Sequence, residues 1–163
     1  MSDCPEMRAV IQRVSRARVM VENELVGAIG PGLAVLVGVG AGDSQADTVA
    51  LASKIAGLRI FADENGHMNR SVLEAGGEIL VISQFTLYGD VARGRRPSFG
   101  AAAPPEVAEP LIAGVIDRLA AMGVKTAQGR FGARMEVELT NQGPVTILIE
   151  TRGGRYVALS EAT

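Results

Sequence analysis

Residue types that usually carry acid–base or nucleophilic chemistry are scarce in this chain of 163 residues. It has one cysteine (Cys4), one histidine (His67) and no tryptophan. A lone cysteine excludes a disulfide framework within the chain, and one histidine cannot form a multi-histidine zinc site. His67 lies among asparagines and a glycine, where a solvated side chain is more common than a general base. We therefore expect neither a cysteine or histidine catalyst nor a metal site.

Long apolar runs are also missing. The run at residues 33–39 has the length of a strand, far short of the ~20 residues that span a bilayer. The first residues have neither the basic start nor the apolar stretch of a secretory signal. Hydrophobic residues make up 47% of the chain and charged residues 21%, which is typical of a globular domain. We therefore expect one cytoplasmic domain without a membrane partner.

Lysine is rare in the sequence. Lys54 and Lys125 are the only lysines among the 16 lysine and arginine residues. Arg93, Arg95 and Arg96 cluster in one loop. The planar guanidinium group suits phosphate recognition, but clustered charge also occurs on ordinary solvated surfaces. The net charge of −2 gives no indication of DNA binding.

The order of the elements predicts an α+β fold. Apolar runs predict strands at 8–21, 25–29, 33–39, 78–83, 135–140 and 145–150. One helix begins at a cap formed by Asp43 or Ser44, and a second begins at Pro104 and ends before Gly123. We expect a single, largely antiparallel and barrel-like sheet with both helices on one side, in which strands joined through a helix run parallel.

The segment Ser83-Gln84-Phe85-Thr86 follows a buried strand and contains no group that is ionised near neutral pH. Backbone N–H groups leave the ladder at a strand end and are free to point into a cleft. Those of Gln84 and Phe85 are candidates to stabilise an oxyanion, with the Thr86 hydroxyl nearby as nucleophile or positioning group. An ordinary polar strand end explains the same residues.

The pair Gly143-Pro144 lies between two strand-like runs. Proline removes a ladder donor, and X–Pro bonds adopt the cis form in roughly 5–6% of cases. A cis turn here would aim neighbouring carbonyls in a similar direction, where they can receive an ammonium group. A tight hairpin turn without a ligand is the other interpretation.

Several ordered motifs across residues 7–150 make the chain resemble the D-aminoacyl-tRNA deacylases of the type with a Gly-cisPro motif. They are Met7 to Val14, Gly38-Val39, Lys54 to Phe61, Ser83 to Leu87, Arg95 to Phe99, Gly129 to Ala133 and Asn141 to Thr146. Residues 7–150 would form the deacylase domain, with residues 1–6 as an N-terminal extension. Residues 151–163 would be a poorly ordered C-terminal tail.

The resemblance implies hydrolysis of the ester between a D-amino acid and the terminal ribose of tRNA, without a cofactor. Glycyl-tRNA would also be a substrate, including glycine mischarged on the tRNA for alanine. The family is a homodimer whose active site lies at the subunit interface. Gly143 and Pro144 of one subunit would reject L-aminoacyl esters in the site of the other. Ser83, Gln84, Phe85 and Thr86 then become the catalytic segment.

Further site residues remain open. Phe131 and Met135 are candidates for the pocket wall or for the core. Arg95 and Arg96 are the first candidates for tRNA phosphates, with Arg13 on the strand face as a third. Two other functions also fit the sequence, namely a related deacylase that removes L-alanine from a mischarged tRNA, and a catalytically silent RNA-binding module on the same fold.

Overall fold

A long N-terminal strand organises the fold in the computed structural model, which describes residues 6–158. Strand β1 (Met7–Val21) pairs antiparallel with β8 (Glu136–Arg152) along one edge. Its other edge pairs antiparallel with β3 (Gly32–Gly38) and then with β2 (Glu24–Ile29). The remaining strands extend the sheet from these central pairs.

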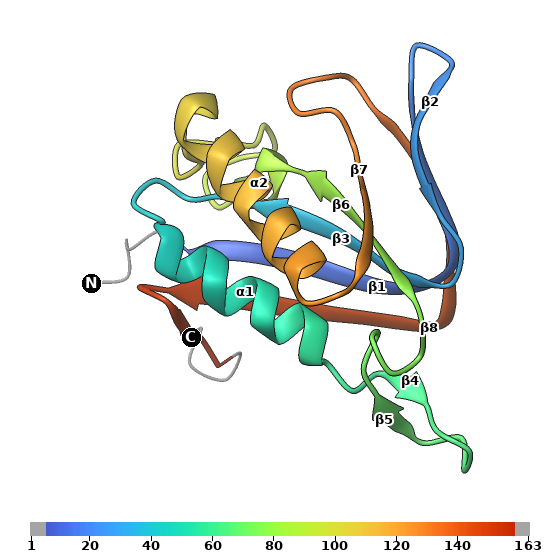
Figure 1. Cartoon of the computed structure of the whole chain (residues 1–163). Helices are drawn as coiled ribbons and strands as arrows, with labels where there is room; N and C mark the ends of the chain where they lie inside the picture. The colour runs from blue at the N-terminus through green and yellow to red at the C-terminus, as the bar shows by residue number, and fades with distance from the viewer. Residues whose placement is uncertain (1–5, 159–163) are drawn as a thin grey trace.

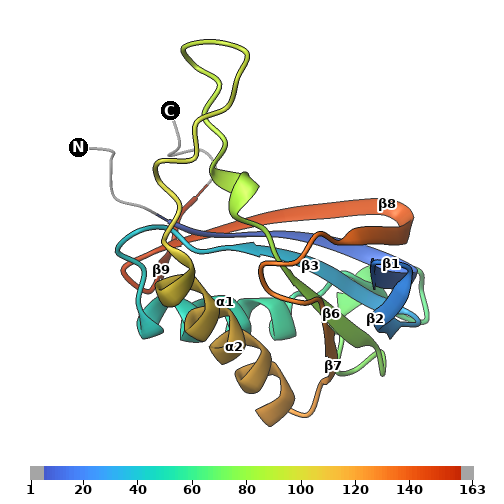
Figure 2. The ribbon, with the colours of Figure 1, turned by 90° about the horizontal axis from the view of Figure 1, so that it is seen from above.

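The far side of the sheet is parallel. Strand β6 (Glu78–Ser83) pairs with β3, and β7 (Lys125–Gln128) pairs with β6, both in parallel. Each parallel step contains a helix, α1 (Gln45–Gly57) or α2 (Pro105–Ala121), as parallel crossovers require. Both helices lie on the same face of the curved sheet (Figures 1 and 2). The predicted α+β class and helix placement are confirmed.

The helix starts follow the local sequence. Ser44 and Asp47 form a capping box at the start of α1, which satisfies two backbone donors. Pro105 occupies the first turn of α2, where its missing N–H has no cost. The apolar stripes of both helices pack on the sheet and form the main core, with Leu51, Ile55, Leu111, Val115 and Leu119 among its buried members.

A second core lies on the opposite face, where the sheet curls. It gathers Val14, Val19, Ala34, Leu80 and Ile82. Along β3 and β6 the two cores alternate residue by residue, as the pleat dictates. Along β1 the alternation changes phase once, between Val14 and Arg16, where β1 advances two residues against one residue of β8. This bulge places Ala17 and Val19 on the same face as Val14.

The segment expected to contain two strands is one strand. Both halves of β8 pair with β1, from Glu136 opposite Met20 to Thr151 opposite Met7. Gly143 and Pro144 lie at the irregularity between these halves, so the chain does not turn back there. The hairpin interpretation of this pair is therefore wrong. The structure also contains two strands that were not predicted from the sequence, namely β7 and β5 (Met68–Arg70), and β5 forms a small hairpin with β4 (Phe61–Ala62).

The C-terminal tail is more ordered than predicted. β8 continues to Arg152, and β9 (Arg155–Tyr156) folds back onto it. The carboxylate of Asp47 accepts hydrogen bonds from the Thr151 hydroxyl (2.8 Å) and from the Gly154 N–H (2.9 Å). The prediction of a poorly ordered tail is wrong up to residue 158, and its remainder lies outside the described residues, as do residues 1–5.

Within residues 6–158, neither helix combines the length and the apolar character that crossing a membrane would require.

Candidate active site

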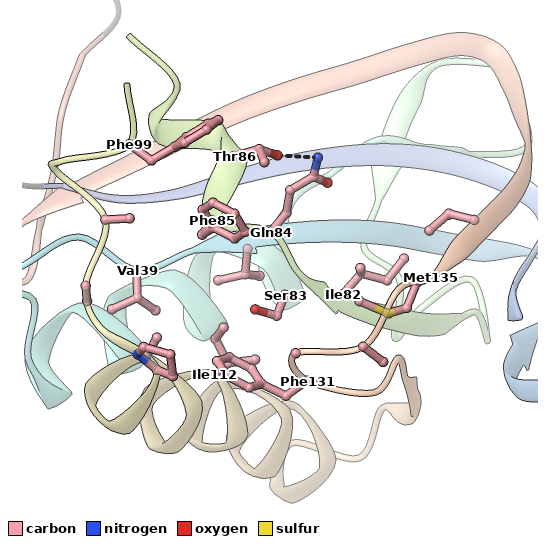
Figure 3. Close-up of a pocket in the computed structure, with 18 residues that line it drawn as sticks. Val39, Ile82, Ser83, Gln84, Phe85, Thr86, Phe99, Ile112, Phe131 and Met135 are labelled. Carbon is pink, nitrogen blue, oxygen red and sulfur yellow. Dashed lines mark hydrogen bonds between the residues drawn. The ribbon is translucent and has the colours of Figure 1, made fainter. Parts of the chain in front are cut away.

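A pocket of about 700 Å³ opens where β6 ends. Ser83 is the last residue of β6, and the chain then enters a short 3₁₀ helix, η1 (Phe85–Tyr88). The pocket brings together six of the residues predicted from the sequence (Figure 3), namely Ser83, Gln84, Phe85, Thr86, Phe131 and Met135. They come from β6, η1 and the connection between β7 and β8, which are far apart in the sequence.

The backbone N–H groups that are free at the end of β6 differ by one residue from the predicted pair, Gln84 and Phe85. The N–H of Gln84 donates to the carbonyl of Val37 (2.8 Å), which extends the parallel pairing of β3 and β6 by one step. It is therefore not free to stabilise an oxyanion, contrary to expectation. A 3₁₀ helix leaves its first N–H groups without an internal acceptor. Among the described residues, the N–H groups of Phe85 and Thr86 have no recorded acceptor.

The Thr86 hydroxyl accepts a hydrogen bond from the side-chain amide of Gln84 (2.9 Å), drawn as a dashed line in Figure 3. None of the 18 described residues that line the pocket is a Cys, His, Asp, Glu, Lys, Arg or Tyr. No lining side chain is therefore placed to take a proton from Thr86, as a hydroxyl nucleophile would need.

The rest of the lining is apolar. Phe131 and Ile112 lie on the α2 side of the pocket, and Met135 lies near Ile82 of β6 (Figure 3). Phe131 also packs against the main core and Met135 against the second core. Both residues therefore line this pocket and also pack against a core, and their place in an active site stays a prediction. Phe99 contacts Phe85 edge to face, with ring centroids 5.2 Å apart and planes at 74°.

Buried and half-buried residues contact η1 on the side away from the pocket, and the sequence analysis did not predict these contacts. Tyr88 is buried, and its hydroxyl donates to the carbonyl of Glu6. Arg8 donates to the Leu87 carbonyl (2.9 Å), and its guanidinium carbon lies 5.0 Å from the centre of the Tyr88 ring. A side chain at Gly38 would meet Tyr88 at 2.8 Å and the Gln84 carbonyl at 3.1 Å. A glycine just before a strand end was the only sequence signal.

Carboxylates near this support have altered pKa values. A hydrogen bond with Glu6 and burial together raise the pKa of Glu150 to about 7, and the same hydrogen bond lowers the pKa of Glu6. Burial raises the pKa of Asp43 to about 6, although the Gly40 N–H donates to its carboxylate (2.6 Å). Within residues 6–158, no three His, Cys, Asp or Glu side chains converge on a site that could hold a metal ion.

Gly143 and Pro144 are exposed and do not line the pocket of their own chain. The peptide bond between them is cis, and Gly143 has φ +137°. The loop is held at both ends. The Asn141 carboxamide oxygen accepts from the Val145 N–H (2.7 Å), and its amide nitrogen donates to the Thr146 hydroxyl (3.1 Å).

Arg13 makes two hydrogen bonds within the chain, and its contact with a tRNA phosphate stays a prediction. Its Nε donates to the carbonyl of Gln142 (3.0 Å), and its Nη1 donates to the carbonyl of Ile60 (2.7 Å). The guanidinium group thereby ties the Gly143-Pro144 loop to the segment after α1.

Arg95 and Arg96 lie in an exposed loop that projects from the body of the protein (the yellow-green loop in Figure 2). They line a second, polar cavity of about 500 Å³ together with Arg93, Asp90 and Ser98. Within the described chain, the recorded ion pairs include none of these three guanidinium groups. The loop therefore keeps a net positive charge available to solvent.

Comparison with known proteins agrees with this geometry. The sequence pattern of the D-Tyr-tRNA(Tyr) deacylase family matches residues 10–150. A D-aminoacyl-tRNA deacylase from Heliobacterium modesticaldum is 60% identical over 148 residues, which are 91% of this chain and 99% of the relative. One from Symbiobacterium thermophilum is 61% identical over 145 residues, or 89% and 96%. The chain belongs to the D-Tyr-tRNA(Tyr) deacylase family, whose members are hydrolases.

Solved structures show the same fold. One described as a c-Myc DNA unwinding element binding protein has a TM-score of 0.85 and 41% identity, and the match covers 90% of this chain and 99% of that one. Another, described as a probable eukaryotic D-amino acid tRNA deacylase, has a TM-score of 0.77. Its identity of 19%, over 90% of this chain and 100% of that one, supports a shared fold alone.

Proposed function

We propose that this protein hydrolyses the ester that joins a D-amino acid to the terminal ribose of tRNA, releasing free D-amino acid and tRNA. One observation carries the proposal: backbone N–H groups without acceptors lie at the edge of an apolar pocket whose lining has no titratable side chain. Such a site suits an already activated ester, which needs orientation and charge stabilisation more than a protein acid or base. The names of the relatives agree with this substrate class.

In the proposed mechanism, the N–H groups of Phe85 and Thr86 receive the negative charge that develops on the ester carbonyl oxygen. One donor of this kind contributes roughly 10²–10³-fold in rate. Water attacks the carbonyl carbon, the neighbouring ribose 2′-hydroxyl assists proton transfer, and the ribose 3′-oxygen leaves with a proton. Ser83 and Gln84 position this segment, and Gln84 also orients the Thr86 hydroxyl.

Chiral selection is assigned to Gly143 and Pro144. We infer that their carbonyls hold the α-ammonium group of the substrate, so that an L-side chain would collide with this backbone. Because the backbone would exclude the L-side chain, the D-side chain would remain unconstrained. Glycyl esters, which have no side chain, would also be accepted. Two observations support a fixed loop of this kind: Arg13 binds the carbonyl of Gln142, and Asn141 bridges to Val145.

The selecting loop would act in the pocket of a second subunit. It is exposed and absent from the pocket of its own chain. The sheet face opposite the helices also carries a row of apolar residues across three strands, because Val10 pairs with Leu36 on one side and with Leu148 on the other. Leu148 is 52% exposed. A homodimer formed through this face would cover the row.

The first test is hydrolysis of matched D-Tyr-tRNA and L-Tyr-tRNA by the purified protein with EDTA present. We expect rapid loss of the D-ester alone. Glycine attached to the tRNA for alanine should also be hydrolysed. Hydrolysis of L-Ala-tRNA in place of the D-ester would assign the chain to the L-alanine corrector. Tight tRNA binding without turnover would assign it to the silent RNA-binding module.

Mixed dimers test the cross-subunit arrangement. One subunit would carry Pro144→Ala and the other Phe85→Pro, which removes one of the two proposed oxyanion donors, and each variant should have little activity alone. If loop and pocket come from different subunits, co-refolded mixtures regain activity, because one intact pocket then faces one intact loop. Activity that stays at the level of the separate variants would contradict the arrangement. A tRNA substrate supports a cytoplasmic location, which fractionation of the native host would check.

A further inference from the structure

The loop of residues 89–100, here called the arginine loop, joins the charged surface to the pocket wall (Figure 2). It leaves η1 at Gly89, whose N–H donates to the Thr86 carbonyl (3.0 Å). It returns beside β3, where the Ala103 N–H donates to the Val39 carbonyl (2.9 Å). Thr86, Val39 and Ala103 all line the pocket, so both ends of the loop are fixed to pocket residues.

The base of the loop is closed by two reciprocal backbone hydrogen bonds. The Asp90 N–H donates to the Ser98 carbonyl (2.7 Å), and the Ser98 N–H donates to the Asp90 carbonyl (2.9 Å). The residue that follows Ser98 is Phe99, whose ring contacts Phe85 edge to face. A displacement of the paired base therefore moves Phe99 directly. Phe85 is 58% exposed, so Phe99 is a substantial part of its support.

The tip of the loop carries charge of one sign. Arg93, Arg95 and Arg96 line the second cavity, and among residues 6–158 Asp90 is the one acidic residue in its lining. The Asp90 carboxylate already accepts the Ala92 N–H (2.9 Å). Arginine forks match phosphate oxygens in pairs. From Asp90 to Arg95 the chain spans at most roughly 17 Å, so the phosphate that these arginines bind would lie within that distance of the base of the loop, apart from the length of the side chain itself.

We propose that the arginine loop is a positioning element: an RNA backbone phosphate bound by Arg93, Arg95 and Arg96 fixes Phe99, and through it the Phe85 wall beside the backbone donors. The proposal rests on the proposed function and extends it. Phosphate binding at the tip then raises the rate of ester cleavage as well as affinity. An ester that lacks phosphates leaves Phe99 less restrained and is cleaved more slowly at saturation.

Two substrates with the same reacting ester test this coupling: D-Tyr-tRNA and 3′-O-D-tyrosyl adenosine, which has no phosphate. We compare the wild type with a triple variant, Arg93→Gln, Arg95→Gln and Arg96→Gln. Arg118→Gln on α2 is the matched control, since Arg118 is exposed and does not line the pocket. In the wild type, kcat on tRNA should exceed kcat on the adenosine ester. In the triple variant the two kcat values should become equal, and kcat/KM on tRNA should fall by about tenfold or more at moderate salt.

Phe99 supplies the second half of the test. Phe99→Leu should lower kcat on both substrates, and Phe99→Tyr, which keeps the ring edge, should restore it. When the three arginine substitutions are added to Phe99→Leu, KM for tRNA should rise and kcat should not fall further. This non-additivity is expected when two changes act through one contact. A positioning role thus appears as a split between kcat and KM, which general destabilisation would not produce.

Three outcomes would overturn the inference. In the first, the triple variant changes KM and leaves kcat unchanged. In the second, the losses of kcat caused by the triple variant and by Phe99→Leu are independent, so that the combined variant loses the product of both. In the third, Phe99→Leu leaves kcat unchanged. If the wild type is active on D-Tyr-tRNA, any of these outcomes leaves the proposed function intact. It then contradicts only the proposed link between phosphate binding and the position of Phe99. A wild type that cleaves neither substrate overturns both.

Discussion

Gly38→Ala is the most direct test of how the catalytic segment is held. Gly38 ends β3 and is buried against η1. An added Cβ would lie 2.8 Å from Cε2 of Tyr88, 3.1 Å from the Gln84 carbonyl oxygen and 3.4 Å from Cβ of Leu87. Ordinary contacts begin at 3.4 Å, so η1 must move away from β3 by about 0.6 Å, because a packed interior cannot absorb the overlap.

The expected loss is larger for catalysis than for folding. Overpacking of this kind lowers the free energy of unfolding by about 1–3 kcal/mol. A displacement approaching 1 Å at the reacting groups costs up to about 10²-fold in rate, so we expect single-turnover hydrolysis of D-Tyr-tRNA to fall by about tenfold or more. Urea unfolding gives the first quantity, and rapid-quench assays under conditions where the variant is fully folded give the second.

Gly57→Ala is the matched control. It lies in α1 with no atom within 4 Å of the added Cβ, so the change should leave the rate unaltered and raise stability by up to about 1 kcal/mol. Adding Tyr88→Leu to Gly38→Ala removes the closest clash and should recover part of the rate. A folded Gly38→Ala protein with a rate within about twofold of wild type, well short of the cost expected from misplaced reacting groups, would refute this account.

Four further predictions concern other parts of the molecule. Arg13→Gln should raise the rate on L-Tyr-tRNA relative to D-Tyr-tRNA, because the selecting loop loses its bond from the guanidinium group; an unchanged ratio in competition assays would contradict that role. Burial raises the pKa of Asp43 from 3.8 to about 6, so the folded state binds this proton more readily than the unfolded state, and stability should decline as pH rises through that window. Asp43→Asn should flatten that slope in urea titrations at successive pH values, and a slope as steep as in wild type would argue against Asp43 as its source. Asp47→Ala should lower the free energy of unfolding by about 3 kcal/mol, since buried donors from the tail lose their charged acceptor; a loss below about 1 kcal/mol would show that the tail contributes little. Thr86→Ala should keep at least about a tenth of the single-turnover activity, because a positioning hydroxyl contributes less than a nucleophile, and trapping of a covalent aminoacyl-Thr86 ester would refute it.

The parts of the fold that the sequence predicted are those with strong local signals. Strands β3 and β6 are continuous apolar runs because they are buried on both faces. The start of α1 follows from Ser44 and the acidic residue three positions later. The pocket segment at Ser83 to Thr86 was found because a buried strand ends there.

The errors arise where distant residues decide the outcome. The Gln84 N–H is occupied because Val37 lies beside it in a parallel pair, a register that residue 84 itself does not reveal. β7 is short and polar and pairs because α2 delivers it to the edge of β6. The tail is ordered by Asp47, more than a hundred positions earlier. Phe99 was overlooked because its partner, Phe85, lies across a loop.

The position of Gly143 and Pro144 inside one long strand constrains how the protein can evolve. Both halves of β8 pair with the same β1, and the five steps from Asn141 to Thr146 lie opposite only two steps of β1, from Val14 to Gln12. Because residues 142–145 bulge out of the ladder, pairing with β1 on both sides would keep Ile149 buried if the bulge changed in length. A length change would instead move Gly143 and Pro144 away from the position that Arg13 and Asn141 give the loop. Insertions and deletions here should therefore impair chiral selection before they impair stability.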